Sequence, residues 1–115
     1  MKDLSKHLQS LLSVPSYVGS WPATPIDCVA VRLTYSFGRR HFAGQEISVQ
    51  YIVFMIRHRD YTTGMTWAEA IRTQFHQYSD LYIKHMFSPA GPRYLRYRAQ
   101  RTHEFEIRFK IFLKE

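Results

Sequence analysis

Two groups of basic side chains carry most of the chemistry that this sequence offers. Between Leu81 and His103 there is no acidic residue, and the stretch RYLRYRAQR alternates arginines with tyrosines. A second group lies around residues 39–41 and 57–59. Guanidinium groups bind carboxylates and phosphates through a planar fork of N–H donors, and tyrosine rings can stack on nucleobases. The candidate contact residues for an acidic protein or a nucleic acid are therefore Arg39, Arg40, Arg57, Arg59, Arg93, Arg96, Arg98 and Arg101.

Signatures of catalysis and metal binding are absent from the sequence. The 6 histidines are scattered without the His-x-x-x-His spacing of a helical zinc site, and the single cysteine, Cys28, cannot supply a cysteine-based one. The sequence has neither a Gly-x-Ser-x-Gly motif nor a phosphate-binding glycine loop. Glu104 and Glu106 fall on one face of an expected strand, which favours a charged solvent-exposed surface over an acid/base pair. We expect no enzymatic activity, no catalytic residue and no cofactor.

Length and composition predict one globular domain over residues 1–115. Hydrophobic residues make up 45% of the 115 residues, and the formal net charge is +7. A chain of this length supports a single hydrophobic core, and its charge favours an anionic partner. The lone cysteine fits a reducing compartment, and no apolar run approaches the roughly 20 residues that a membrane span requires. We therefore expect a soluble, cytosolic protein with no membrane partner.

The spacing of apolar side chains predicts two helices and four strands. A proline-rich connection over residues 13–25 and a loop over Phe37–Gly44 separate the first elements. Thr66-Trp67-Ala68-Glu69 fits a capping box that starts the second helix. The expected order is a helix over about 2–12, strands over 27–36 and 45–58, a helix over Thr66–Tyr78, and strands over 81–87 and 104–113.

These elements predict an α+β fold of the order helix, two strands, helix, two strands. We expect a mainly antiparallel sheet of about four strands packed against the second helix, with the amino-terminal helix at an edge or interface. The segment YIVFMI, residues 51–56, is apolar on both faces, whereas one helical layer covers only one. The second apolar set, Ile52, Phe54 and Ile56, therefore needs cover from another element or from another copy of the chain, and we expect it to lie in an interface between copies.

The order of these segments resembles the small tail terminator and minor capsid (tail-completion) proteins of long-tailed bacteriophages. The resemblance rests on the helix LSKHLQSLL, the strand CVAVRLTYSFGRR, the long strand ISVQYIVFMIRHRDYTTG, the helix MTWAEAIRTQFHQ and the closing strand HEFEIRFKIFLK. The stretch RYLRYRAQR is more basic than this pattern. The order and spacing of the segments, and no single motif, carry the resemblance.

This resemblance implies a structural virion protein that assembles into a six-fold ring on the end of a tail tube, stops tube polymerisation and joins the tail to the head or neck. The tail tube protein would meet one face of the ring and a neck or head-completion protein the other. The arginines named above would contact these partners or line the channel for passing DNA. The protein would be made in the host cytoplasm and reside at the tail end or neck of the virion.

Two alternatives remain open at this stage. The first is a basic nucleic-acid-binding module that uses Arg93, Arg96, Arg98 and Arg101 together with Tyr94 and Tyr97. The second is a different head–tail connector or completion protein, which the residue pattern separates poorly from a terminator.

Overall fold

The chain folds into one curved sheet with two helices on one of its faces. The structure is a computed structural model, and it describes residues 4–23, 26–42, 45–98 and 102–113. In chain order the elements are α1 (Leu4–Ser10), β1 (Ser16–Val18), β2 (Cys28–Phe42), β3 (Gln45–His58), α2 (Tyr61–Phe75), β4 (Ile83–Phe87), β5 (Arg93–Arg98) and β6 (Thr102–Leu113). The expected α+β class is confirmed, although the sheet has six strands where about four were predicted.

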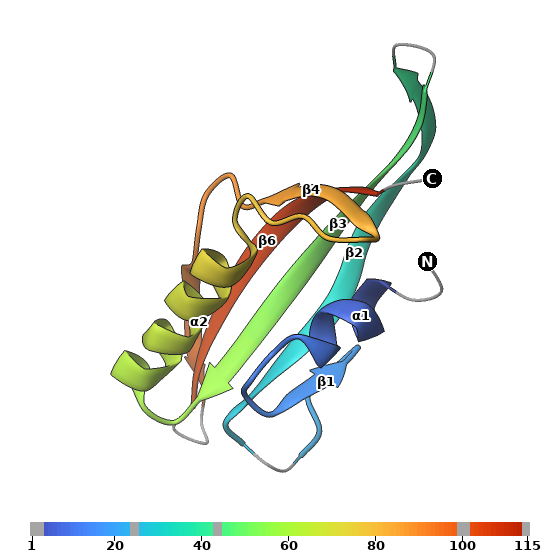
Figure 1. Cartoon of the computed structure of the whole chain (residues 1–115). Helices are drawn as coiled ribbons and strands as arrows, with labels where there is room; N and C mark the ends of the chain where they lie inside the picture. The colour runs from blue at the N-terminus through green and yellow to red at the C-terminus, as the bar shows by residue number, and fades with distance from the viewer. Residues whose placement is uncertain (1–3, 24–25, 43–44, 99–101, 114–115) are drawn as a thin grey trace.

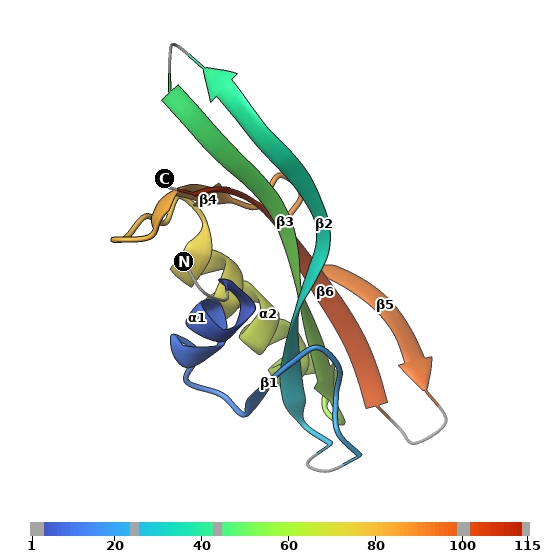
Figure 2. The same cartoon turned by 90° about the vertical axis from the view of Figure 1, so that its right-hand side faces the viewer.

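The strands follow the order β1-β2-β3-β6-β4, and β5 also pairs with β6. Strand β1 is parallel to β2, and every other pair is antiparallel. Strands β4 and β5 share one edge of β6: β4 pairs with residues 110–113 and β5 with residues 102–106. Figure 2 shows β4 and β5 at opposite ends of β6, with both helices on one side of the sheet.

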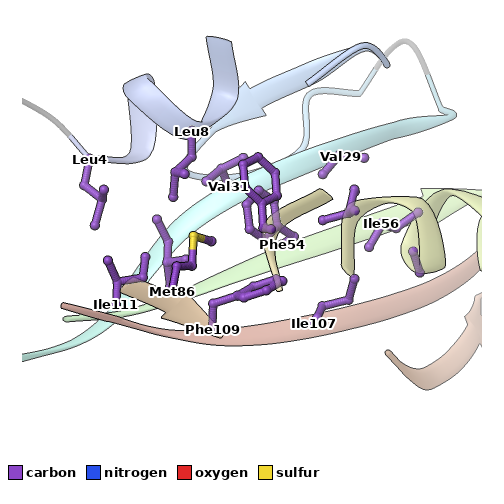
Figure 3. Packing of buried hydrophobic residues seen from close by; sticks show 14 of the residues in the cluster. Leu4, Leu8, Val29, Val31, Phe54, Ile56, Met86, Ile107, Phe109 and Ile111 are labelled. Carbon is purple, nitrogen blue, oxygen red and sulfur yellow. The ribbon is translucent and has the colours of Figure 1, made fainter. Parts of the chain in front are cut away.

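The hydrophobic core fills the space between the sheet and the two helices. The Phe54 ring stacks on Phe75 of α2 at a centroid distance of 5.2 Å and meets the edge of Phe109 at 5.5 Å. Leu4 and Leu8 bring α1 into the same core. Figure 3 shows side chains from β2, β3 and β6 pointing into this one layer. The amino-terminal helix is thus a core element, and it packs over β1 and β2 whereas α2 packs over β3 and β6.

Strands β2 and β3 continue through the segment where the sequence predicted a loop. The ladder extends to the pair Phe42↔Gln45, so the loop predicted over Phe37–Gly44 is wrong for residues 37–42, and residues 43 and 44 lie outside the described residues. Gly38 lies at a register shift between Ser36 and Arg39, which is a common place for glycine within a strand. The two strands therefore form a long hairpin that projects beyond the body of the molecule (Figure 1), whose extents are 51 × 24 × 21 Å.

Helix α2 begins earlier than the capping-box motif predicted. The N-cap is Asp60, whose Oδ2 accepts a hydrogen bond from the Thr63 backbone N–H at 2.8 Å. Thr66 lies inside the helix and donates its hydroxyl to the Thr62 carbonyl at 2.9 Å. Gly64 lies in the first turns of this helix, where a side chain would not fit, because a Cβ at this position would lie 2.5 Å from the Phe105 ring. The helix packs closely on β6 at this point.

The helix also ends earlier than expected. Its last residue is Phe75, with His76 as the C-cap, and Gln77 adopts a φ of 63°. A positive φ is uncommon for a residue other than glycine, and it turns the chain out of the helix. Tyr78 consequently lies outside the helix, where its backbone N–H donates to the Met86 carbonyl at 3.1 Å.

Most of the remaining predicted elements are confirmed with shifted ends, and two strands were missed. The first is β1, which lies within the connection predicted over residues 13–25. The helix expected over 2–12 is observed as Leu4–Ser10, with residues 2 and 3 outside the described residues. The strands expected over 81–87 and 104–113 are β4 and β6. The stretch RYLRYR, treated in the sequence as a basic segment without regular structure, forms β5.

Asp80 connects α1 to the chain around β4. Its Oδ2 is 2.7 Å from His7 Nε2 and accepts a 2.7 Å hydrogen bond from the Tyr78 hydroxyl, while its Oδ1 accepts from the backbone N–H groups of Tyr82 and Ile83. Burial acts to raise the pKa of Asp80, but these hydrogen bonds outweigh it and lower the pKa well below its ordinary value. Burial and the bond to Asp80 raise the pKa of Tyr78 to about 12.

Asp80→Asn is expected to lower the free energy of unfolding by about 1–3 kcal/mol at neutral pH, because an amide cannot accept all four hydrogen bonds as a carboxylate does. A lowered folded-state pKa gives stability that is present above the unfolded-state value, near 3.8, and is lost as the pH falls below it. Urea denaturation of both proteins at several pH values checks this. A stability difference that stays constant down to about pH 3 would contradict it.

Candidate interaction surfaces

The arginines of β5 are paired with the carboxylates of β6. Arg93 Nη2 lies 2.8 Å from Glu106 Oε1, and Arg96 Nε lies 3.2 Å from Glu104 Oε1. The Glu104 and Glu106 side chains are only 6% and 11% exposed, so the solvent-exposed acidic surface expected from the sequence is wrong. The strand register explains this result, because Arg93 stands opposite Glu106 and Arg96 opposite Glu104. Part of the positive charge of this segment is thereby neutralised within the chain.

The tyrosines of β5 lie on the other face of the strand. The Tyr94 ring contacts Phe105 and Tyr61 at centroid distances of 5.3 Å each, and Tyr97 packs on His103 at 4.9 Å. Successive side chains of a strand point to opposite faces, and a register shift between Tyr94 and Arg96 preserves this separation. The arginines and tyrosines therefore do not form the interleaved surface on which the nucleic-acid alternative depended.

Arg57 holds a loop against the sheet face that lies away from the helices. Its Nε donates to the Ile26 carbonyl at 2.7 Å, its Nη2 donates to the Pro22 carbonyl at 2.6 Å, and its guanidinium lies 5.2 Å from the Trp21 ring centroid. The Trp21 Nε1–H in turn donates to the Met55 carbonyl at 2.9 Å. Arg57 therefore has a structural role inside the subunit, which differs from the partner contact predicted for it.

Arg59 lies beside this loop and is paired with Asp27. Its Nη2 is 3.0 Å from Asp27 Oδ2, and its backbone N–H also donates to that carboxylate. Burial acts to raise the pKa of Asp27, but the hydrogen bonds from Arg59 outweigh it and lower the pKa. Cys28, next in the chain, is fully buried, and burial raises the pKa of its thiol. This agrees with a packed side chain in preference to a nucleophile.

The other predicted contact residues are spread along the sheet. In the β2–β3 ladder Arg39 stands opposite Ser48 and Arg40 opposite Ile47, whereas Arg57 stands opposite Cys28 at the far end. The second basic group of the sequence is thus divided between the two ends of the hairpin. Arg98 pairs in register with Thr102, and Arg101 lies outside the described residues.

Ile52, Phe54 and Ile56, the predicted interface residues, are fully buried within one subunit. They face the helices and belong to the core. On the opposite face of β3, Val53 is 1% exposed, Tyr51 and Met55 are half-buried, and the loop anchored by Trp21 and Arg57 contacts the strand at Met55. The prediction that these three side chains contact another copy is therefore wrong. The two helices supply the cover that was expected from a second copy of the chain.

A cavity that the sequence did not indicate lies between β4 and β5, where, among the described residues, the edge of β6 that faces away from β3 has no strand beside residues 107–109. It has a volume of about 390 Å³, and its lining includes Tyr51, Pro89, Arg93, Glu106, Arg108 and Lys110. The last three alternate along β6 with the core residues Ile107 and Phe109, which places them on the face away from the helices. In the sequence, the alternation of charged and apolar residues along 106–110 indicates that these charged side chains share a face. It does not indicate that β4 and β5 pair with separate parts of β6 and leave a cavity between them.

The outer edge of β2 is a second feature of interest. Strand β1 covers only Val29–Val31 of this edge, and beyond Val31 no described strand pairs with it. The Val29 N–H donates to the Pro15 carbonyl and the Val31 carbonyl accepts from the Gly19 N–H, each at 2.9 Å, so the backbone groups of these residues point outward. Because outward and inward groups alternate along a strand, Leu33 is the next residue to present a backbone donor and acceptor at this edge.

No protein family and no curated protein matches the sequence. Among solved structures, the chain resembles one from the "Virion of native gene transfer agent (GTA) particle", with a TM-score of 0.63 and 11% sequence identity. The match covers 94% of this chain and 84% of the other. At this identity the comparison shows a shared fold.

The described residues contain neither a metal-binding cluster nor a membrane-spanning helix. Within residues 4–23, 26–42, 45–98 and 102–113, no group of three or more His, Cys, Asp or Glu side chains is placed to hold a metal ion. In these same ranges no helix has the length and apolar character needed to cross a membrane.

Phe54→Ala is expected to lower the free energy of unfolding of the isolated chain by about 3–5 kcal/mol, because it leaves a cavity between Phe75 and Phe109. Leu81→Ala removes an exposed apolar side chain and is expected to change it by less than about 0.5 kcal/mol. Urea denaturation measures both variants. If Phe54 served an interface between copies instead, its replacement would leave the isolated chain as stable as the Leu81 control.

Proposed function

We propose that this chain is a structural protein of a phage-like virion that forms a ring on the end of the tail tube, stops tube polymerisation and joins the tail to the head or neck. Two findings support the proposal: the order of its segments resembles tail terminator proteins, and its fold is shared, over 94% of the chain, with a chain of a gene transfer agent virion. The chain would therefore reside in the virion after assembly in the host cytoplasm.

The open outer edge of β2 is the observation that carries the ring. A strand edge presents unpaired N–H and C=O groups, and proteins that remain monomeric keep such edges short or cover them. Here the edge continues past Val31 along a projecting hairpin, with no strand of the described residues beside it. This edge supports assembly independently of Ile52, Phe54 and Ile56, which lie in the core.

A ring of identical subunits needs two different surfaces that complement each other. The outer edge of β2 is one such surface, and the outer edge of β5, which pairs with β6 on its other side only, is a second among the described strands. Pairing one edge with the other in the next subunit is a heterologous contact, which closes into a ring at a suitable rotation. We propose six subunits, as in the terminators that the sequence resembles.

The partners follow from the same proposal. The tail tube protein would meet one face of the ring and a neck or head-completion protein the other. Arg39 and Arg40, on the projecting hairpin, and the exposed Arg59, Arg93 and Arg96 would contact these proteins or the passing DNA. Arg98 and Arg101 complete this proposed set.

The stage of assembly is tested with particles that lack the protein. Electron microscopy is expected to show overlong tails, because nothing would stop tube polymerisation. Tails of normal length that are detached from heads would instead indicate a joining or completion protein of the same particle. Normal tails attached to heads would contradict both roles.

Leu33→Pro tests the edge itself. Proline removes the outward N–H at Leu33 and leaves the inward groups of its neighbours, so the β2–β3 ladder is expected to persist while edge pairing is blocked. Leu33→Thr is the matched control, since it removes the same exposed apolar side chain and keeps the N–H. We expect particles with Leu33→Pro to resemble particles without the protein, and those with Leu33→Thr to resemble wild type.

Circular dichroism of the two purified variants provides the control for folding. Both should give the wild-type spectrum. Wild-type tails in particles that carry a folded Leu33→Pro chain would refute the edge contact, whereas the loss of tail-length control with Leu33→Pro alone would support it.

A further inference from the structure

The cavity beside β6 combines an incompletely paired strand with a surplus of positive charge. Strand β4 pairs with β6 from residue 110 onward and β5 pairs with it up to residue 106, so the connection between β4 and β5 passes over an open stretch of β6. Pro89 from this connection and Tyr51 from β3 form apolar walls. The recess of about 390 Å³ is large enough to accept a side chain from another molecule.

The lining of the cavity contains three cations and one carboxylate, and two of the cations contact that carboxylate. Arg93 Nη2 and Arg108 Nε both approach the same oxygen of Glu106, Oε1, at 2.8 and 3.3 Å. Lys110 Nζ lies over the rings of Tyr51 and Phe112 at 5.9 and 5.3 Å. Three positive groups and one negative group leave a local charge of +2 at this cavity. Like charges held this close together favour the arrival of an anion.

The arginines retain donors for such an anion. The Arg93 and Arg108 side chains are 67% and 66% exposed although each contacts Glu106. Within the described residues, the contact between Arg108 and Glu106 uses Nε alone, which leaves its two terminal amino groups. Those groups can bind a carboxylate in the forked geometry that arginine favours.

We propose that this cavity binds a carboxylate side chain from an acidic segment of a protein partner. The apolar walls suit the methylene groups of a glutamate and a neighbouring apolar residue, while Arg93, Arg108 and Lys110 bind the charge. Duplex DNA fits less well, because its phosphates lie on a continuous backbone that cannot enter a recess. The identity of the partner as a tail or neck protein rests on the proposed function, whereas the binding site itself does not.

An NMR titration of the full-length, ¹⁵N-labelled chain with an acetylated and amidated Glu-Leu-Glu peptide tests this inference. Saturable shifts are expected for backbone amides around the cavity, including those of Gly91 and Arg93. Arg108→Ala is expected to weaken binding by about tenfold, a typical value for the loss of a charge-assisted pair. Lys84→Ala, which removes an exposed cation of β4 outside the lining, should leave the affinity unchanged.

Glu106→Gln provides a test in the opposite direction. It removes the internal carboxylate that competes for the two arginines, so the peptide is expected to bind several-fold more tightly. If Glu106 only held the two arginines in place for folding, the Glu106→Gln change would not increase the affinity for the peptide. The site would be refuted by equal losses in Arg108→Ala and Lys84→Ala, by shifts scattered over the basic surface, or by weaker binding in a folded Glu106→Gln chain.

A short DNA duplex serves as the second probe. If it shifts the cavity amides at lower concentration than the peptide does, the protein-carboxylate proposal is refuted in favour of phosphate. Both titrations use the isolated chain, so their failure would leave the ring proposal standing. Failure of the particle experiments would likewise leave a measured peptide site intact.

Discussion

The need to cover both faces of β3 determines the arrangement of the whole subunit. This strand lies between β2 and β6, and its residues 52–56 are apolar or buried on both sides. On one side the Phe54 ring is enclosed by Phe75 and Phe109, which fixes α2 against the sheet. On the other side the loop held by Trp21 and Arg57 lies over the strands. Both contacts come from the same chain, so the packing of β3 does not require a partner.

The sequence was most informative where side chains alternate regularly. The apolar residues of β6 and those of α2 predicted a strand and a helix in the observed places, because burial on one face imposes its period on the chain. The start of α2 was misplaced because the capping-box pattern at Thr66 was taken as the N-cap, whereas Asp60 caps the helix and Gly64, inside it, makes room for Phe105. The turn predicted at Phe37–Gly44 failed because Gly38 accompanies a shift in strand register. At Gly64 the glycine meets the needs of a tertiary contact with Phe105 that the local sequence does not contain.

The positions of the charges were harder to predict than the positions of the elements. The segment from Leu81 to His103 has no acidic residue, and yet Glu104 and Glu106 neutralise part of it across a strand pair that the sequence did not reveal. Arg57, expected to meet a partner, is used to anchor a loop. A net charge of +7 therefore overstates the basic surface available for binding. The cavity required knowledge of where β4 ends and β5 begins along β6, which depends on long-range pairing.

The position of β6 has a consequence for how the subunit is made. Strand β6 lies between β3 and the pair β4 and β5, but it follows all of them along the chain. During synthesis on the ribosome, Phe54 and its neighbours therefore emerge well before the strand that completes their sheet. Until Phe109 is translated, the nascent chain exposes an apolar surface that is prone to aggregate. Synthesis thus delays completion of the fold until nearly all of the described chain has been made.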